Sequence, residues 1–493
     1  MSDPTFFWLI WLPLLAAPLV YLVGRLLPEW LCRWLALAVC LLAWVALGLT
    51  WAGWTGASGP QFALGEVTLR LDGVTLLLAL VSLSLTTLVI LYSPATLAGL
   101  PGQEKYYALL LALCGSMIGL SSATDLFNLW LWFEATALAS YLLVAFYRQQ
   151  PASLEAGLKY LVQGVAGSVL VLFGVAVVLA ATGSLVLAEI RVAASSTPVM
   201  LAAAALFVTG FGVKIAIVPL HTWLPDAHSQ APSGISAMLS GAVIEAGLVA
   251  LLRVVAALAG VTASWGLLLL GLGAINMLVG NLLALPQTQL KRLLAFSSIS
   301  HVGVMLTGIG TAVYSGELLG MQGALFHLLT HGLMKGLAFL IAGALLYGLH
   351  QAQDEHAPLT IEEMSGAGWR YPLAGLALAV ALLSLGGVPP LAGFMSKWQV
   401  LLAGLATGRS LLIGAALFTA FNSLLSLAYY IPLLGIVYRR EPSAAVQAAR
   451  PLPATMQLPI AILMLTIVLV GLWPDLFSGL TQDAGLALLA LGS

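Results

Sequence analysis

The sequence has little charge: only 8% of its 493 residues are Asp, Glu, Lys or Arg, whereas 61% are hydrophobic. Soluble domains carry roughly 25% charged residues, so this shortage argues against an ordinary soluble fold. A net charge of −1 offers no basic surface for nucleic acid. Apolar runs of about 20 residues recur along the chain instead, each long enough to cross a hydrocarbon core of about 30 Å. The composition therefore predicts an all-α polytopic membrane protein.

Cysteine is also scarce, since the chain has only Cys32, Cys40 and Cys114. They lie in apolar segments without a CxxC pair, which gives neither a disulfide framework nor a ligand set for an iron–sulfur cluster. The chain has no GxGxxG motif and no haem motif. We therefore expect no cofactor, no metal and no catalytic residue of redox type here, and any oxidoreductase activity would belong to partner subunits.

About 14 membrane spans are predicted from the apolar runs. Their ranges are near 6–26, 31–53, 73–94, 106–121, 126–147, 158–182, 199–220, 233–254, 264–285, 292–313, 320–349, 372–404, 411–438 and 455–474. Residues 62–71 partly alternate apolar and polar side chains, which predicts a short hairpin outside the membrane. About 19 residues follow the last span, and we expect no long lateral helix there.

Two spans carry helix-breaking residues, which remove backbone donors and clash with the preceding turn. Lys214 precedes the break in the seventh span, and Lys397 follows the break in the twelfth. Because these spans lie five apart, spans 4–8 and 9–13 are predicted to be two inverted repeats with discontinuous helices 7 and 12. The helix-breaking residues are Pro219, Pro225, Pro389 and Pro390. The corresponding units are residues 1–100, 101–260, 261–440 and 441–493.

The basic residues of the loops predict an orientation. Loops after odd-numbered spans contain 11 of them: Arg25, Arg33, Lys105, Arg148, Lys159, Lys291, Arg292, Arg370, Arg439, Arg440 and Arg450. Loops after even-numbered spans contain four: Arg70, Arg191, Arg253 and Arg409. We therefore expect the odd loops to face the cytoplasm and both termini to lie on the outer, periplasmic side of the inner (plasma) membrane.

Several ionisable residues lie inside predicted spans, where each charge costs about 2.5–3.5 kcal/mol on insertion scales. Five such charges come to roughly 12–18 kcal/mol, comparable with the net stability of a typical protein, ~5–15 kcal/mol. They must therefore pair, become neutral or contact internal water. The five charged residues and the three histidines near them, here called the buried row, are Glu134, Lys214, Glu245, His301, His327, His331, Lys335 and Lys397.

Two interpretations of the buried row compete. In the first, pairs such as Glu134 with Lys214 are static structural ion pairs. In the second, the row is a hydrated proton relay, which suits lysine because burial favours its neutral form and lets it release a proton. His327, His331 and Lys335 are spaced i, i+4, i+8 and share one helix face. Two histidines four apart could bind a metal, but no third ligand with suitable spacing accompanies them.

His301 is predicted to belong to the same relay, with a structural hydrogen bond from a neutral histidine as the alternative.

Five segments around the buried row carry a resemblance to a known family. They are LWFEATALASYLL, KIAIVPLHTWLPDAHSQAPSGISAMLSGAVI, LKRLLAFSSISHVGVM, HLLTHGLMKGLAFLIAG and LSLGGVPPLAGFMSKW. The chain resembles the antiporter-like membrane subunits shared by respiratory complex I, Mrp multisubunit cation/proton antiporters and membrane-bound hydrogenases, over nearly its whole length.

The resemblance implies a 14-helix fold with inverted five-helix repeats and one proton channel. In that family the glutamate of helix 5, here Glu134, pairs with the lysine of helix 7, here Lys214. Lysines or histidines of helices 8, 10 and 11 link two half-channels, and Lys397 on helix 12 leads outward. A glutamate on helix 5 with a lysine on helix 12 looks most like the D-type Mrp subunit and its hydrogenase-linked relatives.

One position departs from the family pattern. Where many members have a lysine on helix 8, this chain has Glu245. An acid there could hold Lys214 in a salt bridge between Glu134 and Glu245, act as a loaded proton carrier, or help to bind a cation such as sodium.

The leading hypothesis is therefore a proton-translocating antiporter-like subunit of a multisubunit complex, embedded in lipid beside homologous membrane subunits. Such a complex would be a translocase of the NADH:quinone oxidoreductase or hydrogenase kind. The alternatives are a Na⁺(K⁺)/H⁺ secondary antiporter subunit without a redox partner, a structural membrane scaffold, and a subunit of an inorganic-carbon uptake complex.

Overall fold

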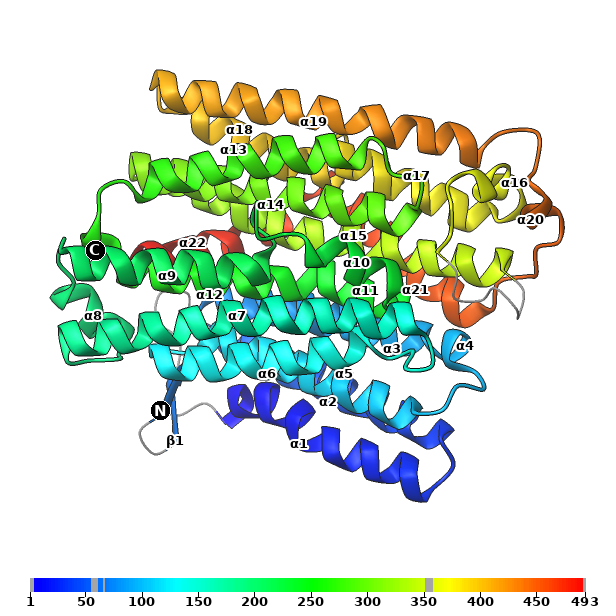
Figure 1. The fold of residues 1–493 in the computed structure, drawn as a ribbon, viewed down its shortest axis with the longest axis horizontal. Coiled ribbons are helices and arrows are strands. Elements are labelled where there is room, and N and C mark those ends of the chain that lie inside the picture. The colour runs from blue at the N-terminus through cyan, green and yellow to red at the C-terminus, as the bar shows by residue number, and fades with distance from the viewer. Residues whose placement is uncertain (1–3, 55–60, 65–66, 351–357, 491–493) are drawn as a thin grey trace.

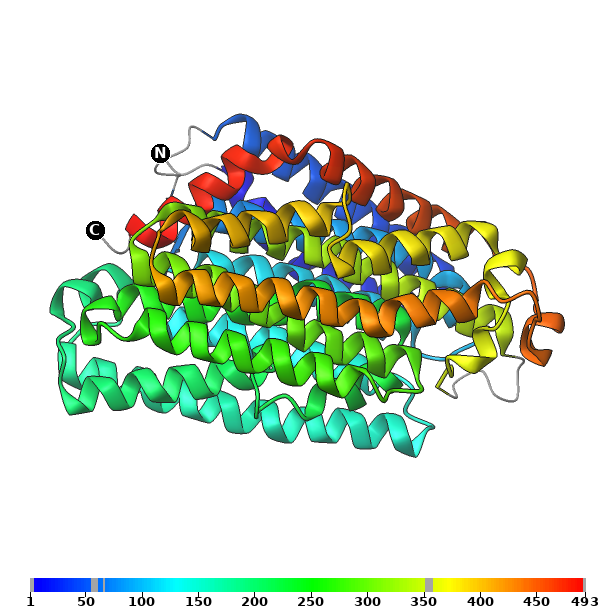
Figure 2. The same ribbon diagram turned by 90° about the horizontal axis from the view of Figure 1, so that it is seen from above.

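The computed structural model describes residues 4–54, 61–64, 67–350 and 358–490. Within these ranges 13 helices are long and apolar enough to cross a membrane, and they run side by side along the long axis of the molecule (Figures 1 and 2). They are α1 (Pro4–Leu26), α2 (Trp30–Ala52), α3 (Gly73–Tyr92), α5 (Gln103–Ser122), α6 (Leu126–Val144), α7 (Pro151–Thr182), α9 (Pro198–Ile215), the continuous α11 (Ser233–Met238), η1 (Leu239–Val243) and α12 (Ile244–Ala257), then α13 (Trp265–Ala284), α14 (Leu290–Ser315), α15 (Leu318–Leu349), α19 (Ser410–Val437) and α21 (Ala454–Leu472).

The expected twelfth span is made of two half-length helices, α17 (Pro372–Gly386) and α18 (Ala392–Ala406). Each has 15 residues, or about 22 Å of helix, so neither spans a bilayer alone. The seventh span is also shorter than expected, because α9 ends at Ile215 rather than near residue 220. A short helix, α10 (Trp223–Gln230), follows it. The polytopic all-helical fold with discontinuous seventh and twelfth spans is confirmed.

The two ends of the bundle differ. The predicted hairpin is confirmed: β1 (Gln61–Leu64) pairs antiparallel with β2 (Val67–Arg70), with Phe62 opposite Leu69. This end, the hairpin end, also holds α8 (Leu187–Ala193). The opposite end, here called the basic end, holds α4 (Pro94–Leu97), α16 (Ala367–Arg370) and α20 (Ala444–Gln447) (Figure 1). Helix α1 begins and the last helix ends at the hairpin end (Figure 1).

That last helix is α22 (Ser478–Ala490), which follows the 3₁₀ turn η4 (Pro474–Phe477) and was not predicted from the sequence. It packs against α3 and α15. The Trp54 indole donates a 3.1 Å hydrogen bond to the Asp483 carboxylate, which ties the end of α2 to α22. The residues after the last span therefore close the hairpin end of the bundle.

Burial separates an inner set of helices from an outer set. In the most apolar 18-residue stretch of α14 and of the α11–α12 segment, 100% of the residues are buried within the protein, and in that of α15 the share is 89%. In the corresponding stretch of α19 only 28% are buried. A helix buried on every side can hold polar groups away from lipid. The inner helices are therefore the place where ionisable side chains can face one another.

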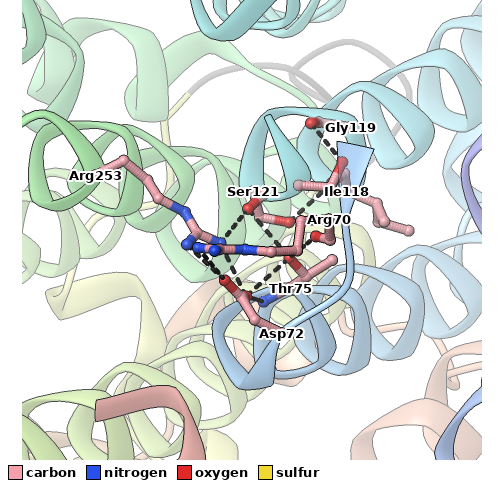
Figure 3. A network of polar contacts seen from close by, with 8 residues as sticks. Arg70, Asp72, Thr75, Ile118, Gly119, Ser121 and Arg253 are labelled. Carbon is pink, nitrogen blue, oxygen red and sulfur yellow. Dashed lines mark hydrogen bonds and ion pairs between the residues drawn. The ribbon is translucent and has the colours of Figure 1, made fainter. Parts of the chain in front are cut away.

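Arg253 was expected in an outer loop, but the structure places it inside α12, 2% exposed. Its guanidinium binds both carboxylate oxygens of Asp72, at 2.5 and 2.8 Å, and donates a 2.6 Å hydrogen bond to the Ser121 carbonyl oxygen (Figure 3). Asp72 also caps α3 by accepting from the Thr75 backbone at 3.0 Å. The pair therefore joins α3, α5 and α12 near the hairpin end.

Lys291 is likewise not a solvated loop residue, since it is buried at the start of α14. With Arg253 and Lys291 removed, the loop counts of basic residues become 10 and 3 instead of 11 and 4. The asymmetry remains, so the predicted orientation keeps its basis.

Candidate functional site

Lys214 lies at the last turn of α9, where the helix breaks. Ala216 caps the helix with φ of 60°, a left-handed conformation that costs a non-glycine residue roughly 1–2 kcal/mol. The free backbone N–H of Val218 is satisfied by the Asn276 side chain of α13 at 2.9 Å. Neighbouring protein thus covers the broken backbone, as membrane depth requires.

The helix-breaking residues fall into different positions. Pro219 lies in the break between α9 and α10, whereas Pro225 lies within the first turn of α10, where proline is tolerated. Our expectation that Pro225 interrupts a helix is corrected in this way. Pro389 and Pro390 both lie between α17 and α18.

The Lys214 ammonium is 2% exposed and is held by hydroxyl groups. Its Nζ donates to the Tyr160 hydroxyl at 2.6 Å and to the Ser140 hydroxyl at 2.9 Å. It also lies 4.8 and 5.0 Å from the ring centroids of Tyr160 and Tyr141, within cation–π range. Tyr160 in turn stacks on Trp223 at 3.9 Å, so α10 fixes the lysine's main partner.

Glu134 does not form the expected direct pair with Lys214. Among the described residues no carboxylate oxygen lies within 4 Å of the Lys214 ammonium. Glu134 is half-buried on α6, and its Oε1 has no hydrogen-bond partner in the described part of the chain. Helices α6 and α9 pack together here, with the ring centroids of Phe133 and Phe211 5.2 Å apart. Glu134 and Lys214 are neighbours without a contact, and the static ion pair that we considered is not formed.

A π-helical turn, η1, ends two residues before Glu245 of α12. Such turns are rare and often occur at functional sites. The Glu245 side chain is fully buried, and its Oε1 shares a 2.8 Å hydrogen bond with Nδ1 of His331 on α15. Its Oε2 has no partner in the described part of the chain. Of the roles we considered for Glu245, a salt bridge to Lys214 is therefore not formed.

Two further histidines lie beside His331. Nδ1 of His301 on α14 and Nε2 of His327 on α15 are 2.9 Å apart, and the other nitrogen of His327 bonds the Ser396 hydroxyl at 2.8 Å. The His301 ring centroid lies 5.2 Å from that of His331. All three rings are buried. They form a compact cluster that links α14, α15 and α18.

Lys397 follows Ser396 on α18, and its Nζ donates to the Leu385 carbonyl at the end of α17 at 2.7 Å. Gly387, which ends α17 with φ of 82°, leaves room for this side chain, because a Cβ there would lie 3.2 Å from the Lys397 Cδ. The break between α17 and α18 therefore positions a lysine, as the break between α9 and α10 does. Lys214 precedes its break, and Lys397 follows its own.

Lys335 turns toward α14 rather than toward the histidines. Its Nζ donates to the Leu294 carbonyl at 2.8 Å and to the Ser297 hydroxyl. The expected shared helix face of His327, His331 and Lys335 is present, but the three side chains contact different partners. No group of three or more His, Cys, Asp or Glu side chains within the described ranges is arranged to hold a metal ion.

The structure thus arranges most of the buried row in three hydrogen-bonded groups, with Glu134 and Lys335 outside them. The first is Lys214 with its hydroxyls, the second is Glu245 with His331, and the third is His301, His327 and Ser396, beside Lys397. Such an arrangement can pass protons within a group and, when side chains or water bridge a gap, between groups. Sequence reasoning missed Ser140, Tyr160 and Ser396, because single hydroxyl side chains in apolar helices carry no pattern of their own.

Comparisons with known proteins agree with this architecture. Residues 123–426 match the family described as NADH:quinone oxidoreductase/Mrp antiporter, transmembrane. The F(420)H(2) dehydrogenase subunit N of Methanosarcina mazei is 32% identical over 437 residues, which cover 87% of this chain and 86% of that protein. NADH-quinone oxidoreductase subunit N of Desulforudis audaxviator is 31% identical over 462 residues, 89% and 88% of the two chains.

A solved structure is similar over its whole length. A chain of the membrane-bound sulfane sulfur reductase, an archaeal respiratory membrane complex, superposes with a TM-score of 0.88 at 27% identity. The superposition covers 99% of each chain. The fold described above is therefore that of a subunit found in a respiratory membrane complex.

Proposed function

This chain belongs to the NADH:quinone oxidoreductase/Mrp antiporter family of membrane subunits, and from that premise we propose that it moves protons along the buried row. It is an antiporter-like, multi-pass subunit of the kind found in complex I, Mrp antiporters and related multisubunit complexes, so other membrane subunits are its partners. The row would connect the two broken helices through the middle of the bundle. We infer further that the basic end faces the cytoplasm.

The observation that carries the proposal is the Glu245–His331 contact. It places two groups that can each gain or lose a proton 2.8 Å apart, fully buried and between the two lysines of the broken helices. A scaffold needs no ionisable pair at this depth, where an apolar pair is as stable or more so. A buried pair that is costly to keep supports a transport role over a purely structural one.

The test is proton flux in membrane vesicles from cells that hold the complete complex. We expect Lys214→Met to abolish flux, because methionine keeps the side chain's length but carries no proton. We expect Glu245→Lys to preserve it, if Glu245 takes the place of the family's usual lysine as a proton carrier. Arg440→Met, which removes an exposed arginine between α19 and α20 at the basic end, is the control. Full flux in Lys214→Met would refute the proposal and favour a scaffold.

A Na⁺(K⁺)/H⁺ antiporter without a redox partner is the second candidate. Oε2 of Glu245 has no partner among the described residues, and a carboxylate oxygen is a suitable ligand for a hard cation. Sodium-dependent proton flux in a complex purified without redox subunits would favour this candidate. Flux that requires an electron donor and is indifferent to sodium would favour the redox-linked subunit, as the two N-type relatives suggest. Coupling to inorganic-carbon uptake would need a soluble partner, which the same purification would reveal.

A further inference from the structure

Helix α15 continues for more than three turns beyond Lys335 of the buried row. In the i, i+4 series from Lys335 the next residues are Phe339, Gly343 and Tyr347, and each step turns about 40° around the helix. Helix α15 ends at the basic end (Figure 1). At 1.5 Å per residue, Tyr347 lies about 18 Å beyond Lys335. The groups that pack beside α15 between Lys335 and Tyr347 therefore decide whether Lys335 can exchange protons with the basic end.

His228 of α10 covers the first part of this interval. Its ring stacks on Phe339, with ring centroids 4.5 Å apart and planes 12° apart. The side chain is fully buried, and neither ring nitrogen has a hydrogen-bond partner in the described structure. Leaving a buried polar group unsatisfied costs about 1–3 kcal/mol, so two such nitrogens on one ring need an explanation other than stability.

A cavity occupies the remaining part. It holds about 50 Å³ and is lined by Lys291, Ser229, Gln289, Gly343 and Tyr347 among others. By this measure a water molecule needs about 10–15 Å³, so three or four would fit beside polar side chains. Lys291 is buried in its wall and donates to the Ala231 carbonyl at 2.8 Å.

Neighbouring residues connect His228 to both lysines: its ring stacks on Phe339, one helical turn from Lys335, and the next residue, Ser229, lines the cavity together with Lys291. The ring therefore lies near Lys335 of the buried row and near the cavity wall that contains Lys291. A histidine can accept a proton on one ring nitrogen while it releases another from the second. This makes His228 suited to passing protons between the two lysines.

We propose that the cavity, Lys291 and His228 form the access route by which protons from the basic end reach Lys335 and the buried row. The route rests on the proposed function. Once water or a side-chain movement bridges the gaps, Lys291 or cavity water gives a proton to one nitrogen of His228, and the other nitrogen gives its proton to the neutral amine of Lys335. One proton moves, the histidine ends neutral, and no oxidant or further reactant is needed.

The experiment measures proton flux in vesicles that contain the complete complex, for Lys291→Met, Lys291→Arg, Lys291→His and His228→Phe. We expect Lys291→Met and His228→Phe to lower flux at least tenfold. Arginine keeps the charge and can still donate to Ala231, but it does not release its proton, so Lys291→Arg should also fail. Histidine can release a proton, so Lys291→His should restore at least part of the flux. Arg440→Met, an exposed position between α19 and α20 that leaves the cavity and α10 intact, should match wild type.

The split between arginine and histidine at position 291 separates a proton carrier from a structural anchor, because an anchor would favour arginine. The amount of assembled complex in each membrane serves as the folding control. If Lys214→Met abolishes flux but the four variants do not lower it, the access route is wrong and the proposed function stands. If Lys214→Met also leaves flux intact, the proposed function itself fails. If Lys291→Arg retains flux while Lys291→His loses it, Lys291 is an anchor and the route is refuted.

Discussion

Glu245 and His331 meet in the centre of the molecule, with 2.8 Å between the carboxylate Oε1 and the imidazole Nδ1. The contact joins α12 to α15 over 86 residues of sequence. On one side, Gly247 of α12 packs against the Lys214 side chain, since a Cβ there would lie 3.3 Å from its Cγ. On the other side His331 lies beside the His301–His327 pair. The Glu245–His331 pair, called the junction below, therefore lies between the groups around Lys214 and those around Lys397.

The first prediction concerns the junction itself. Glu245→Gln keeps an oxygen acceptor for His331 at the same length but removes the ionisable group. We expect proton flux to fall at least tenfold while the complex assembles normally, because the hydrogen bond survives and the proton carrier does not. Flux measured in vesicles, with assembly followed on a native gel, checks this. Unchanged flux would mean that Glu245 serves only as a hydrogen-bond acceptor.

The second prediction concerns the partner of Lys214. Tyr160→Phe removes the hydroxyl that accepts the 2.6 Å bond but keeps the ring that stacks on Trp223. A hydrogen bond to a charged group contributes about 1.5–3 kcal/mol, which corresponds to roughly a tenfold or greater change in flux. Tyr141→Phe is the matched control, since only the Tyr141 ring, 5.0 Å away, faces the ammonium. Equal loss in both variants would contradict a specific role for the Tyr160 hydroxyl.

The third prediction concerns stability at the hairpin end. Asp72→Asn leaves the buried Arg253 guanidinium without its counter-charge, which costs about 3–5 kcal/mol. We therefore expect a clearly lower melting temperature for the purified complex. The double variant Asp72→Leu with Arg253→Met should recover most of that loss, because it removes both buried charges. Arg70→Met is the control: its guanidinium lies 3.8 Å from Asp72 and is 31% exposed, so the loss should stay below about 1 kcal/mol. A double variant as unstable as Asp72→Asn would argue against this electrostatic account.

The fourth prediction concerns the packing that holds the junction. A Cβ at Gly332 would lie 2.7 Å from the Gly241 carbonyl oxygen in the π-helical turn and 2.8 Å from a Val81 methyl group. Gly332→Ala therefore has to push α15 away from the turn, at a cost of about 1–3 kcal/mol, and should lower flux by separating Glu245 from His331. One helical turn further on, Gly336→Ala would meet only the end of the Leu85 side chain, which can rotate aside. If the two alanine variants behave alike, the close approach at Gly332 has no special role.

Much of this protein follows from local sequence. Runs of apolar residues fixed the spans, and the proline and glycine segments marked the breaks near Lys214 and Lys397, because hydropathy and helix-breaking chemistry act within one helical segment. The residues of the buried row could be named for the same reason, since a charge inside an apolar run is visible without a fold. The proposed repeats and their boundaries remain predictions of that kind.

Only the tertiary structure decided which groups touch. Lys214 bonds Tyr160 and Ser140 rather than Glu134, and Glu245 bonds His331 rather than Lys214. Arg253, which was expected in a loop, is buried against Asp72. Such partners are set by the rotation and register of neighbouring helices to within about an ångström, through close glycine contacts and a π-helical turn. In a membrane both the lipid-facing and the protein-facing sides of a helix are apolar, so the sequence pattern carries little information about that register.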